Sequence, residues 1–383
     1  MRVAVVGGGF GGVYAIKLLQ RWSAATITLF EPNERFVFTP LLHEVAVGAL
    51  HPNAVTHVYT DIFRQQITHV KERVTHIDVY KKRLTVGKNN YSFDYIIISP
   101  GAKAHLPKQP VHKLKTIPDA LEIKQTIENN VRDAIAKNDP TLLTCVLVGA
   151  GPTGVELAAE LVDFYKQQIT NQQSTLTPKI TLLEGYPTIL YDTDTRVQNI
   201  ALAKLKKKGV IVHTSAFVEN ITNAGVRAKV HDTQKTFTAA CIIWTAGVQP
   251  HDVASTVEKK EGHFRVDETL QLHDVPYAFA IGDAALLPTP VPKLAQVAVQ
   301  QGAHAAKNIL RVHKGKPGKP FVFNDKGFLV SLGHGYAAGV VKGLCIKGMF
   351  AWILWRTVYL SKFSGVRSKL RIAKEYTKNL FTW

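Results

Sequence analysis

Cysteine and methionine are scarce in this chain of 383 residues, which contains three cysteines and two methionines. Cys145, Cys241 and Cys345 lie far apart in the sequence and form neither a CxxC pair nor a Cys/His cluster. This spacing argues against a disulfide framework and against a structural zinc site, and it gives no support to a redox-active dithiol. We therefore expect no metal.

Acidic residues are also few, since 29 Asp and Glu face 47 Lys and Arg and give a formal net charge of +18. Such an excess of positive charge indicates an anionic partner. The candidates are a nucleic acid, an acidic membrane surface and a phosphate-bearing ligand. The sequence has no zinc-finger spacing, no RNP-like aromatic motif and no basic-region heptad. We therefore expect no nucleic-acid partner.

Long apolar runs are missing. Residues 327–341 are rich in glycine and are interrupted by Ser331 and His334, and residues 348–355 form a shorter apolar stretch. A membrane-spanning helix needs about 20 apolar residues, so we expect no such helix. The first residues already have the pattern of a strand, so we expect no targeting peptide. The length fits two or three domains, and 46% hydrophobic residues suffice for a folded core.

Two glycine-rich motifs follow β-branched strands and precede helical patterns. The first has the sequence GGGFGG from Gly7 to Gly12, and the second has the sequence GAGPTG from Gly149 to Gly154. Both fit G-x-G-x-x-G, in which the glycines form a tight turn, admit a pyrophosphate and allow close packing of helix and strand. The helix N-terminus then attracts the phosphates. The chain is thus expected to contain two doubly wound nucleotide-binding domains.

Periodicity places further elements around these motifs. Helices are expected at 11–22, 119–137 and 293–312, strands at 26–30, 95–98 and 180–184, short strands within 70–98 and 209–246, and a linker with four prolines at 100–118.

Acidic residues stand where a dinucleotide site needs them. Glu31 and Glu184 each end the strand after a glycine motif, where a carboxylate accepts hydrogen bonds from ribose hydroxyls. Glu184 favours NADH, because it repels the 2′-phosphate of NADPH. Glu156 is interpreted either as a carboxylate that stabilises the helix dipole or as a functional group beside the nicotinamide, and we favour the second. A later strand ends in Gly282 and Asp283, and this Asp is suited to a flavin ribityl hydroxyl.

These motifs resemble the flavoproteins with two dinucleotide-binding domains, and within them the type II NADH:quinone oxidoreductases. The segments that carry the resemblance are FTPLLHEVA at 38–46, GAGPTGVE at 149–156, WTAGV at 244–248, AIGD at 280–283 and AQVAVQQ at 295–301. The last segment matches the quinone motif A-Q-x-A-x-Q-Q. Two features depart from the family pattern, namely SPG at 99–101 in place of Ala-Thr-Gly and a shortened, basic segment after Gly101.

The resemblance implies non-covalent FAD in the first domain and NADH in the second. Thr39, Pro40 and Leu41 would line the isoalloxazine, and Ala246 and Gly247 would adjoin the nicotinamide. The catalytic residues would be Glu156, Gln296 and Gln300. The residues expected to bind a nucleotide are Gly7, Gly9, Phe10, Gly11, Gly12, Glu31, Thr39, Pro40, Leu41, Gly101, Gly282, Asp283, Ala295 and Gln296 for FAD, and Gly149, Gly151, Pro152, Thr153, Gly154, Glu156, Glu184, Ala246 and Gly247 for NADH.

The expected fold is α/β, with two Rossmann-like doubly wound domains, the second inserted in the first, and a C-terminal amphipathic segment at the membrane surface. Residues 1–107 and 265–320 would form the FAD-binding domain, 108–264 the NADH-binding domain and 321–383 the C-terminal segment.

The last 42 residues, from Lys342 to Trp383, contain nine Lys or Arg and one acid. From Val366 onward apolar residues fall on one helix face and basic residues on the adjoining flank, a pattern typical of a helix in the membrane interface. A helix packed on the core or in a dimer interface is the alternative. We expect an anionic membrane surface as partner, a homodimer, and a peripheral location on the cytoplasmic face of a prokaryotic-type cell membrane.

The predicted activity is hydride transfer from NADH to FAD followed by transfer of two electrons to a membrane quinone, without proton pumping. One alternative is a related FAD reductase whose electron partner is sulfide or a soluble carrier. Another is a membrane-docked NADH sensor.

Overall fold

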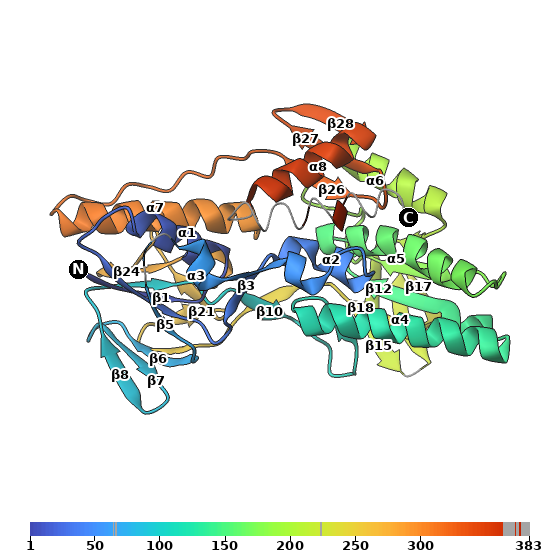
Figure 1. Cartoon of the computed structure of the whole chain (residues 1–383), viewed down its shortest axis with the longest axis horizontal. Coiled ribbons are helices and arrows are strands. Elements are labelled where there is room, and N and C mark those ends of the chain that lie inside the picture. Colours follow the sequence, from blue (N-terminus) through green and yellow to red (C-terminus); the bar gives the residue numbers. More distant parts are fainter. Residues whose placement is uncertain (64, 66, 223, 363–371, 373–374, 377–383) are drawn as a thin grey trace. The chain divides into compact units, whose positions relative to one another are not determined.

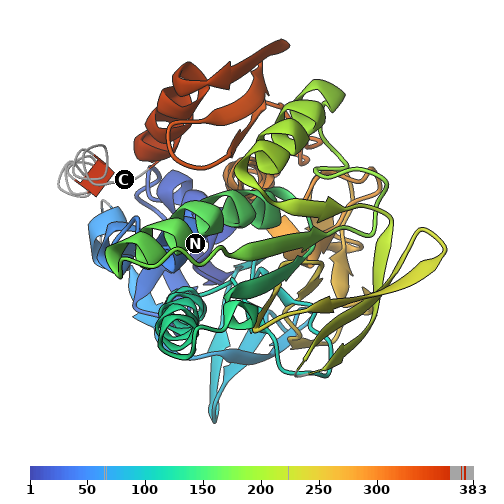
Figure 2. The same cartoon turned by 90° about the vertical axis from the view of Figure 1, so that its right-hand side faces the viewer.

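The computed structural model describes residues 1–63, 65, 67–222, 224–362, 372, 375 and 376 (Figures 1 and 2). The chain divides into two packed units. Unit 1 comprises Met1–Phe36, His57–Lys103 and Val248–Asp325, and unit 2 comprises Val37–Thr56, Ala104–Gly247 and Lys326–Trp383. β3 (Arg35–Val37), β4 (Thr56–Val58) and β10 (Ala102–Ala104) lie at the points where the chain passes between units. The domains expected from the sequence were defined by the nucleotide that each would bind. Their bounds therefore stay a prediction.

Unit 1 is built around a six-stranded sheet with the order β23-β24-β9-β1-β2-β5. Its strands are β1 (Arg2–Val6), β2 (Thr26–Phe30), β5 (Thr68–Val70), β9 (Tyr95–Ile98), β23 (Gln271–Leu272) and β24 (Val275–Ala280). All neighbours pair in parallel except β23 with β24. The central strands β1 and β9 are almost wholly buried, as expected for a parallel sheet with covered faces.

Helices α1 (Phe10–Leu19) and α7 (Ala295–His313) pack against each other beside this sheet (Figure 1). Close contact is possible because Gly302 faces α1, where an added Cβ would lie 2.1 Å from the carbonyl oxygen of Gly11. The predicted inward residues of the first helix, Val13, Ile16 and Leu19, are buried. Both helices are thereby confirmed, although each begins or ends a few residues from its predicted bounds.

Smaller elements complete unit 1. They are α3 (Tyr59–Ile62), β6 (Val74–Asp78), β7 (Arg83–Val86), β8 (Asn89–Ser92), β19 (Val248–Pro250), β20 (Ala254–Ser255), β21 (Lys259–Lys260), β22 (His263–Arg265), the 3₁₀ turn η4 (Gly282–Ala284) and β25 (Ala285–Leu286). The antiparallel ladder β6-β7-β8 confirms the short strands predicted within residues 70–98.

Unit 2 contains a second parallel sheet with the order β11-β18-β12-β13-β14. Its strands are β11 (His112–Lys113), β12 (Thr144–Val148), β13 (Lys179–Leu183), β14 (Ile211–His213) and β18 (Cys241–Trp244). The remaining elements before residue 248 are η1 (Thr39–Leu41), α2 (Leu42–Ala46), η2 (Pro52–Ala54), α4 (Ile117–Lys137), η3 (Pro140–Leu143), α5 (Pro152–Asn171), α6 (Thr195–Lys208), β15 (Ala216–Thr222), β16 (Gly225–Val230) and β17 (Thr233–Thr238).

Two details of unit 2 differ from the sequence prediction. The linker predicted at residues 100–118 contains a strand, since β11 within it pairs in parallel with β18. Helix α4 begins at Ile117 rather than at residue 119. Its start is set by a capping box, in which the Thr116 hydroxyl accepts from the Asp119 N–H and the Asp119 carboxylate accepts from the Thr116 N–H.

The C-terminal part of unit 2 forms a three-stranded antiparallel sheet that the sequence did not predict. It consists of β26 (Phe328–Ser331), β27 (Ala337–Val341) and β28 (Leu344–Gly348), and α8 (Met349–Lys362) lies along it (Figure 2). Trp352 and Trp355 of α8 are buried. The amphipathic helix predicted from Val366 onward lies outside the described residues except for Ile372, Glu375 and Tyr376, of which Ile372 and Tyr376 are buried.

Candidate functional site

The first glycine turn connects β1 to α1 with the geometry that a pyrophosphate site needs. Gly7 has a φ of 97°, a value that favours glycine, and its N–H donates to the Phe30 carbonyl at 2.9 Å. An added Cβ on Gly12 would lie 2.1 Å from the Gly7 oxygen, so this glycine is required by packing. A Cβ on Gly9 would meet no atom within 4 Å. Gly9 therefore borders open space at the start of the helix.

Glu31 is fixed to this turn by backbone hydrogen bonds. Its carboxylate accepts from the Gly8 N–H at 2.9 Å and from the backbone N–H of Asn33 at 3.0 Å. The Tyr59 hydroxyl donates to the Gly8 carbonyl at 2.8 Å. Burial and the charge of Glu31 raise the pKa of Tyr59, so its hydroxyl keeps its proton. Tyr59 was missed in the sequence because nothing in its local motif links it to a turn about fifty residues earlier.

The second glycine turn repeats this arrangement in unit 2. Gly149 has a φ of 100° and donates to the Leu183 carbonyl at 2.8 Å. A Cβ on Gly154 would lie 1.9 Å from the Gly149 oxygen, whereas a Cβ on Gly151 would meet nothing within 4 Å. The carboxylate of Glu184 accepts from the Ala150 N–H at 2.5 Å and from the Tyr186 N–H at 3.0 Å. The two turns are thus equivalent residue by residue.

A hydroxyl just beyond the end of a neighbouring strand, β9 in unit 1 and β18 in unit 2, closes each turn. The Ser99 hydroxyl lies 3.1 Å from the Gly7 oxygen and the Thr245 hydroxyl lies 2.8 Å from the Gly149 oxygen. The serine in the unusual SPG segment therefore provides, in unit 1, the same hydrogen bond that Thr245 provides in unit 2. Ser99, where the sequence departs from the family pattern, thus has a defined structural role in the turn.

The loop after β24 forms a pocket of about 220 Å³ in unit 1. Gly282 and Asp283 line it together with residues at the start of α7. The side-chain oxygen of Gln301, which is buried, accepts from the Gly282 N–H at 2.6 Å and ties α7 to the strand end. Gln301 is the last residue of the AQVAVQQ segment, and its role in joining helix and strand was not foreseen. Gly101, also in unit 1, has a φ of 72°.

Gln296 and Gln300 lie on one face of α7 in unit 1. Gln300 exchanges two hydrogen bonds with the backbone of Asn324, at 2.9 and 3.0 Å, and Gln296 donates to the Asp325 carboxylate at 3.4 Å. Both side chains are half-buried. They therefore hold the segment that follows the helix, and their catalytic role stays a prediction. Thr39, Pro40 and Leu41 form η1 in unit 2, and their contact with a flavin also stays a prediction.

Glu156 lies on α5 and is only 5% exposed. One carboxyl oxygen accepts from the Ser331 N–H at 3.1 Å, and the other lies 3.6 Å from Nδ1 of His43. Burial raises the pKa of Glu156 well above its ordinary value. Because α5 begins at Pro152, Glu156 lies beyond the first turn where the sequence placed it. A carboxylate interacts with the helix dipole only in the first turn, so that explanation is disfavoured.

Two further buried acids lie near Glu156 in unit 2. Burial raises the pKa of Glu44 to about 7 and that of Glu160 to about 8, and it lowers the pKa of His43 to about 3. We call Glu44, Glu156 and Glu160 the buried acid cluster. The guanidinium of Arg356 on α8 lies 3.7 Å from the Glu44 carboxylate and supplies positive charge.

His43, Glu44 and Glu160 each offer one ligand atom within 4.8 Å of the others, the kind of grouping that can hold a cation. Nearby Arg356 and the protonated acids make the site poorly suited to one.

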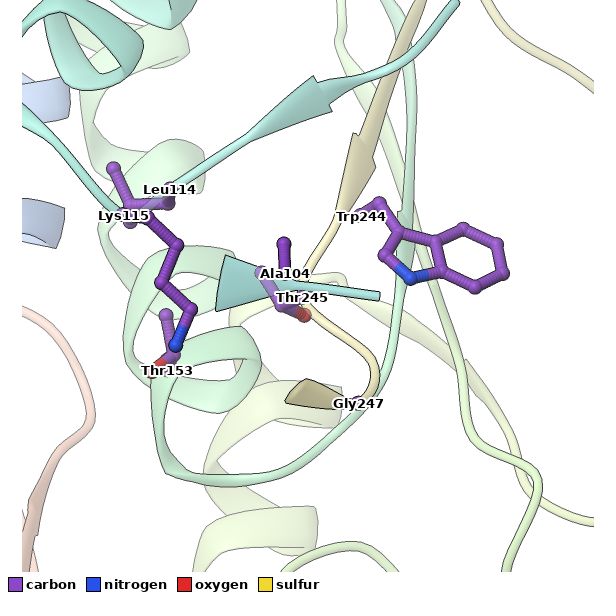
Figure 3. A pocket seen from close by; sticks show the side chains of 7 residues that line it. All are labelled: Ala104, Leu114, Lys115, Thr153, Trp244, Thr245 and Gly247. Atoms are coloured by element: carbon purple, nitrogen blue, oxygen red, sulfur yellow. The ribbon is translucent and has the colours of Figure 1, made fainter. Parts of the chain in front are cut away.

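A small pocket of about 30 Å³ lies beside the second glycine turn (Figure 3). Thr153, Trp244, Thr245 and Gly247 line it, and the side chain of Lys115 runs toward Thr153. The Trp244 indole N–H donates to the Ala246 carbonyl at 2.7 Å, which fixes the backbone of the segment predicted to adjoin the nicotinamide. Lys115 was not singled out in the sequence.

The cysteines are free thiols. Cys145 on β12 and Cys241 on β18 are register partners and are buried in the sheet of unit 2. Their surroundings are those of small apolar core residues. Among the described residues, no helix is both long enough and apolar enough to cross a membrane.

Comparisons with known proteins agree with these features. The family model of the pyridine nucleotide-disulphide oxidoreductases matches residues 1–302. The curated type II NADH:quinone oxidoreductase NdhA of Mycobacterium tuberculosis is 28% identical, with 100% of this chain and 86% of that protein covered. A type II NADH:quinone oxidoreductase of Staphylococcus saprophyticus is 28% identical, with 93% of this chain and 94% of that protein covered.

The structure of NDH2 from Plasmodium falciparum in complex with NADH superposes with a TM-score of 0.92 at 18% sequence identity, and it covers 99% of this chain and 98% of that chain. This likeness establishes a shared fold.

Proposed function

The chain belongs to the pyridine nucleotide-disulphide oxidoreductase family, and from this premise we propose that it transfers a hydride from NADH to bound FAD and then two electrons to a membrane quinone, without pumping protons. The predicted resemblance to type II NADH:quinone oxidoreductases is confirmed by the curated relatives, which carry that name. The observation that carries the proposal is the pair of equivalent glycine turns, each with its own ribose acid.

The residues of unit 1 fit FAD. Gly9 borders open space, so backbone N–H groups at the start of α1 are accessible to a pyrophosphate. Glu31 is held where it can accept from a ribose, and the pocket at Gly282 and Asp283 is suited to the ribityl chain. When bound, the flavin supplies hydride acceptance and electron transfer to the quinone. The chain binds and orients it and excludes water.

The residues of unit 2 fit NADH in the same way. Because Gly151 has no side chain and borders open space, the pyrophosphate can approach the backbone of the turn. Glu184 is proposed to face the adenosine ribose. A carboxylate has lone pairs for about four hydrogen bonds, so Glu184 can accept from ribose hydroxyls in addition to its two backbone donors. The same charge disfavours the 2′-phosphate of NADPH. Ala246 and Gly247 remain the residues proposed to adjoin the nicotinamide.

Glu156 is proposed to hold a proton close to the reaction. Burial raises the pKa of Glu156 and so favours its protonated form, and because Oε1 accepts from the Ser331 N–H, the proton is proposed to lie on Oε2. Reduction of a quinone consumes two protons, so a buried neutral acid has a direct use. Gln296 and Gln300 are proposed to line the quinone site at the start of α7, where the helix N-terminus stabilises negative charge.

Attachment to a membrane surface is proposed for the C-terminal part. Met349, Phe350 and Ile353 on α8 and Leu344 on β28 are large apolar side chains that are more than half exposed. Basic residues of the tail would add attraction to anionic lipid of about 1 kcal/mol each near the surface. A homodimer and a position on the cytoplasmic face of the cell membrane complete the proposal.

The test follows the flavin absorbance of the purified holoprotein under anaerobic conditions. We expect NADH, but not NADPH, to bleach the flavin, and a short-chain quinone analogue to restore it rapidly. Bleaching without reoxidation by quinone would contradict the proposed acceptor.

Cys145→Ala and Cys241→Ala serve as controls for a sulfide mechanism. We expect both variants to keep quinone reduction, because both thiols are buried in strands. Loss of turnover in either variant would instead favour cysteine chemistry.

A further inference from the structure

Two exposed tyrosines form an ordered aromatic surface next to the second glycine turn. The rings of Tyr186 and Tyr191 stack with centroids 4.3 Å apart and an interplanar angle of 13°. Their side chains are 56% and 51% exposed. The ring of Phe217, which is 63% exposed, lies against Gly185 between Glu184 and Tyr186. Three large aromatic side chains thus face solvent around a single strand end.

Backbone hydrogen bonds connect both tyrosines to the nucleotide turn. The Tyr186 N–H donates to the carboxylate of Glu184, and the other oxygen of that carboxylate accepts from the Ala150 N–H. The Leu190 N–H, one residue before Tyr191, donates to the Ala150 carbonyl at 2.9 Å. The aromatic pair is therefore anchored to the same residue, Ala150, as the acid proposed to bind the adenosine ribose.

The loop that carries Tyr191 is held in one conformation. Leu190 has a φ of 51°, which is sterically unfavourable for a residue with a large side chain. The side-chain nitrogen of Gln198 compensates, since it lies 3.0 to 3.1 Å from the carbonyl oxygens of Leu190, Tyr191 and Thr193. A strained loop fixed by this many bonds presents its aromatic side chain in a defined position.

We propose that the stacked pair of Tyr186 and Tyr191 is the platform for the adenine of NADH and that it contributes affinity without taking part in hydride transfer. This inference rests on the proposed function. The adenine is bonded to the ribose that Glu184 would hold, so the base must lie close to this strand end. Flat aromatic side chains stack on nucleobases, and neither tyrosine brings a positive charge that would attract a 2′-phosphate.

The test compares ligands with and without an adenine. ADP-ribose, which has the adenine half of NADH and no nicotinamide, is titrated calorimetrically into FAD-loaded holoprotein. The variants are Tyr186→Leu, Tyr191→Leu and Tyr186→Phe. Tyr80→Leu is the matched control, because Tyr80 is 64% exposed and lies in unit 1. KM and kcat are then measured for NADH and for reduced nicotinamide mononucleotide, which lacks the adenosine.

We expect each tyrosine-to-leucine change in the pair to weaken ADP-ribose binding about tenfold and to raise the KM for NADH equally, with kcat unchanged. Tyr186→Phe and Tyr80→Leu should match the wild type, and the mononucleotide should be oxidised equally by all variants. Three outcomes would each overturn the platform. They are wild-type affinity for ADP-ribose in both leucine variants, no binding of ADP-ribose to the wild type, and an equal loss of activity with NADH and with the mononucleotide. A wild type that binds ADP-ribose through the tyrosines but reduces no quinone would overturn only the proposed function.

Discussion

Replacing Gly151 by alanine tests a glycine that we expect to be needed for the ligand, and the same replacement at Gly154 tests one that is needed for the fold. Gly151 has extended backbone angles, with φ of −68° and ψ of −175°, that any residue adopts, and an added Cβ meets no protein atom within 4 Å. We expect Gly151→Ala to leave the fold intact and even to stabilise it by about 0.4–1 kcal/mol, because alanine restricts the unfolded chain. The new methyl group instead projects into the space proposed for the pyrophosphate.

Gly154→Ala is the contrasting variant. Its Cβ would lie 1.9 Å from the Gly149 carbonyl oxygen, an overlap with backbone that forces a shift of strand or helix. We expect a loss of stability of about 1–3 kcal/mol or more. Displacing a bound substrate by about 1 Å costs on the order of 100-fold in rate, so Gly151→Ala should lower kcat/KM for NADH by about that factor.

The assay measures three quantities on each variant, namely flavin content, thermal midpoint and kcat/KM for NADH. Gly9→Ala is the matched control in unit 1, since its added Cβ also meets nothing within 4 Å. We expect Gly9→Ala to lose FAD and Gly151→Ala to keep FAD while losing affinity for NADH. If Gly151→Ala kept the wild-type KM, or if Gly9→Ala kept its flavin, the assignment of the two turns to pyrophosphates would be wrong.

Three further predictions concern the buried acid cluster, nucleotide choice and the membrane. Burial raises the pKa of Glu160 from 4.5 to about 8, so the folded protein retains a proton that the unfolded chain releases, and stability falls as pH rises between these values, by on the order of 5 kcal/mol. Glu160→Gln should flatten this decline in thermal midpoints of the holoprotein measured from pH 6 to 8.5, and an unchanged slope would contradict it. Glu184→Gln removes the charge that repels a 2′-phosphate, so we expect the ratio of kcat/KM for NADH over NADPH to fall about tenfold; an unchanged ratio would place the selectivity elsewhere. Phe350→Glu should reduce co-sedimentation with anionic vesicles and leave turnover with a soluble quinone analogue unchanged, because Phe350 is 68% exposed; unaltered co-sedimentation would exclude this face of α8 from the membrane contact.

Features encoded by neighbouring residues were predictable from the sequence. Gly7, Gly149 and the acids that end the next strands belong to short motifs whose geometry follows from the turn itself. The first helix, the strand that precedes it and the antiparallel strands after residue 70 were predicted for the same reason, since hydrophobic periodicity is a local signal.

Features that depend on distant partners were not predictable. The Ser331 N–H meets Glu156 only because β26 packs on α5, and these residues are 175 positions apart. The buried acid cluster brings Glu44 of α2 together with Glu156 and Glu160 of α5, and Arg356 of α8 lies beside it. The C-terminal sheet was missed because two of its three strands contain a glycine, a residue that is depleted in strands generally.

The hydrogen bonds that hold Glu31 and Glu184 within their own turns have a thermodynamic consequence. A glutamate side chain loses up to about 2 kcal/mol of rotamer entropy when it is immobilised. Both carboxylates already accept two or more hydrogen bonds from their own turns, so this loss occurs when the chain folds. A nucleotide whose ribose binds there as proposed meets an acceptor whose side chain is already ordered, so more of the enthalpy of its ribose contacts is retained as affinity.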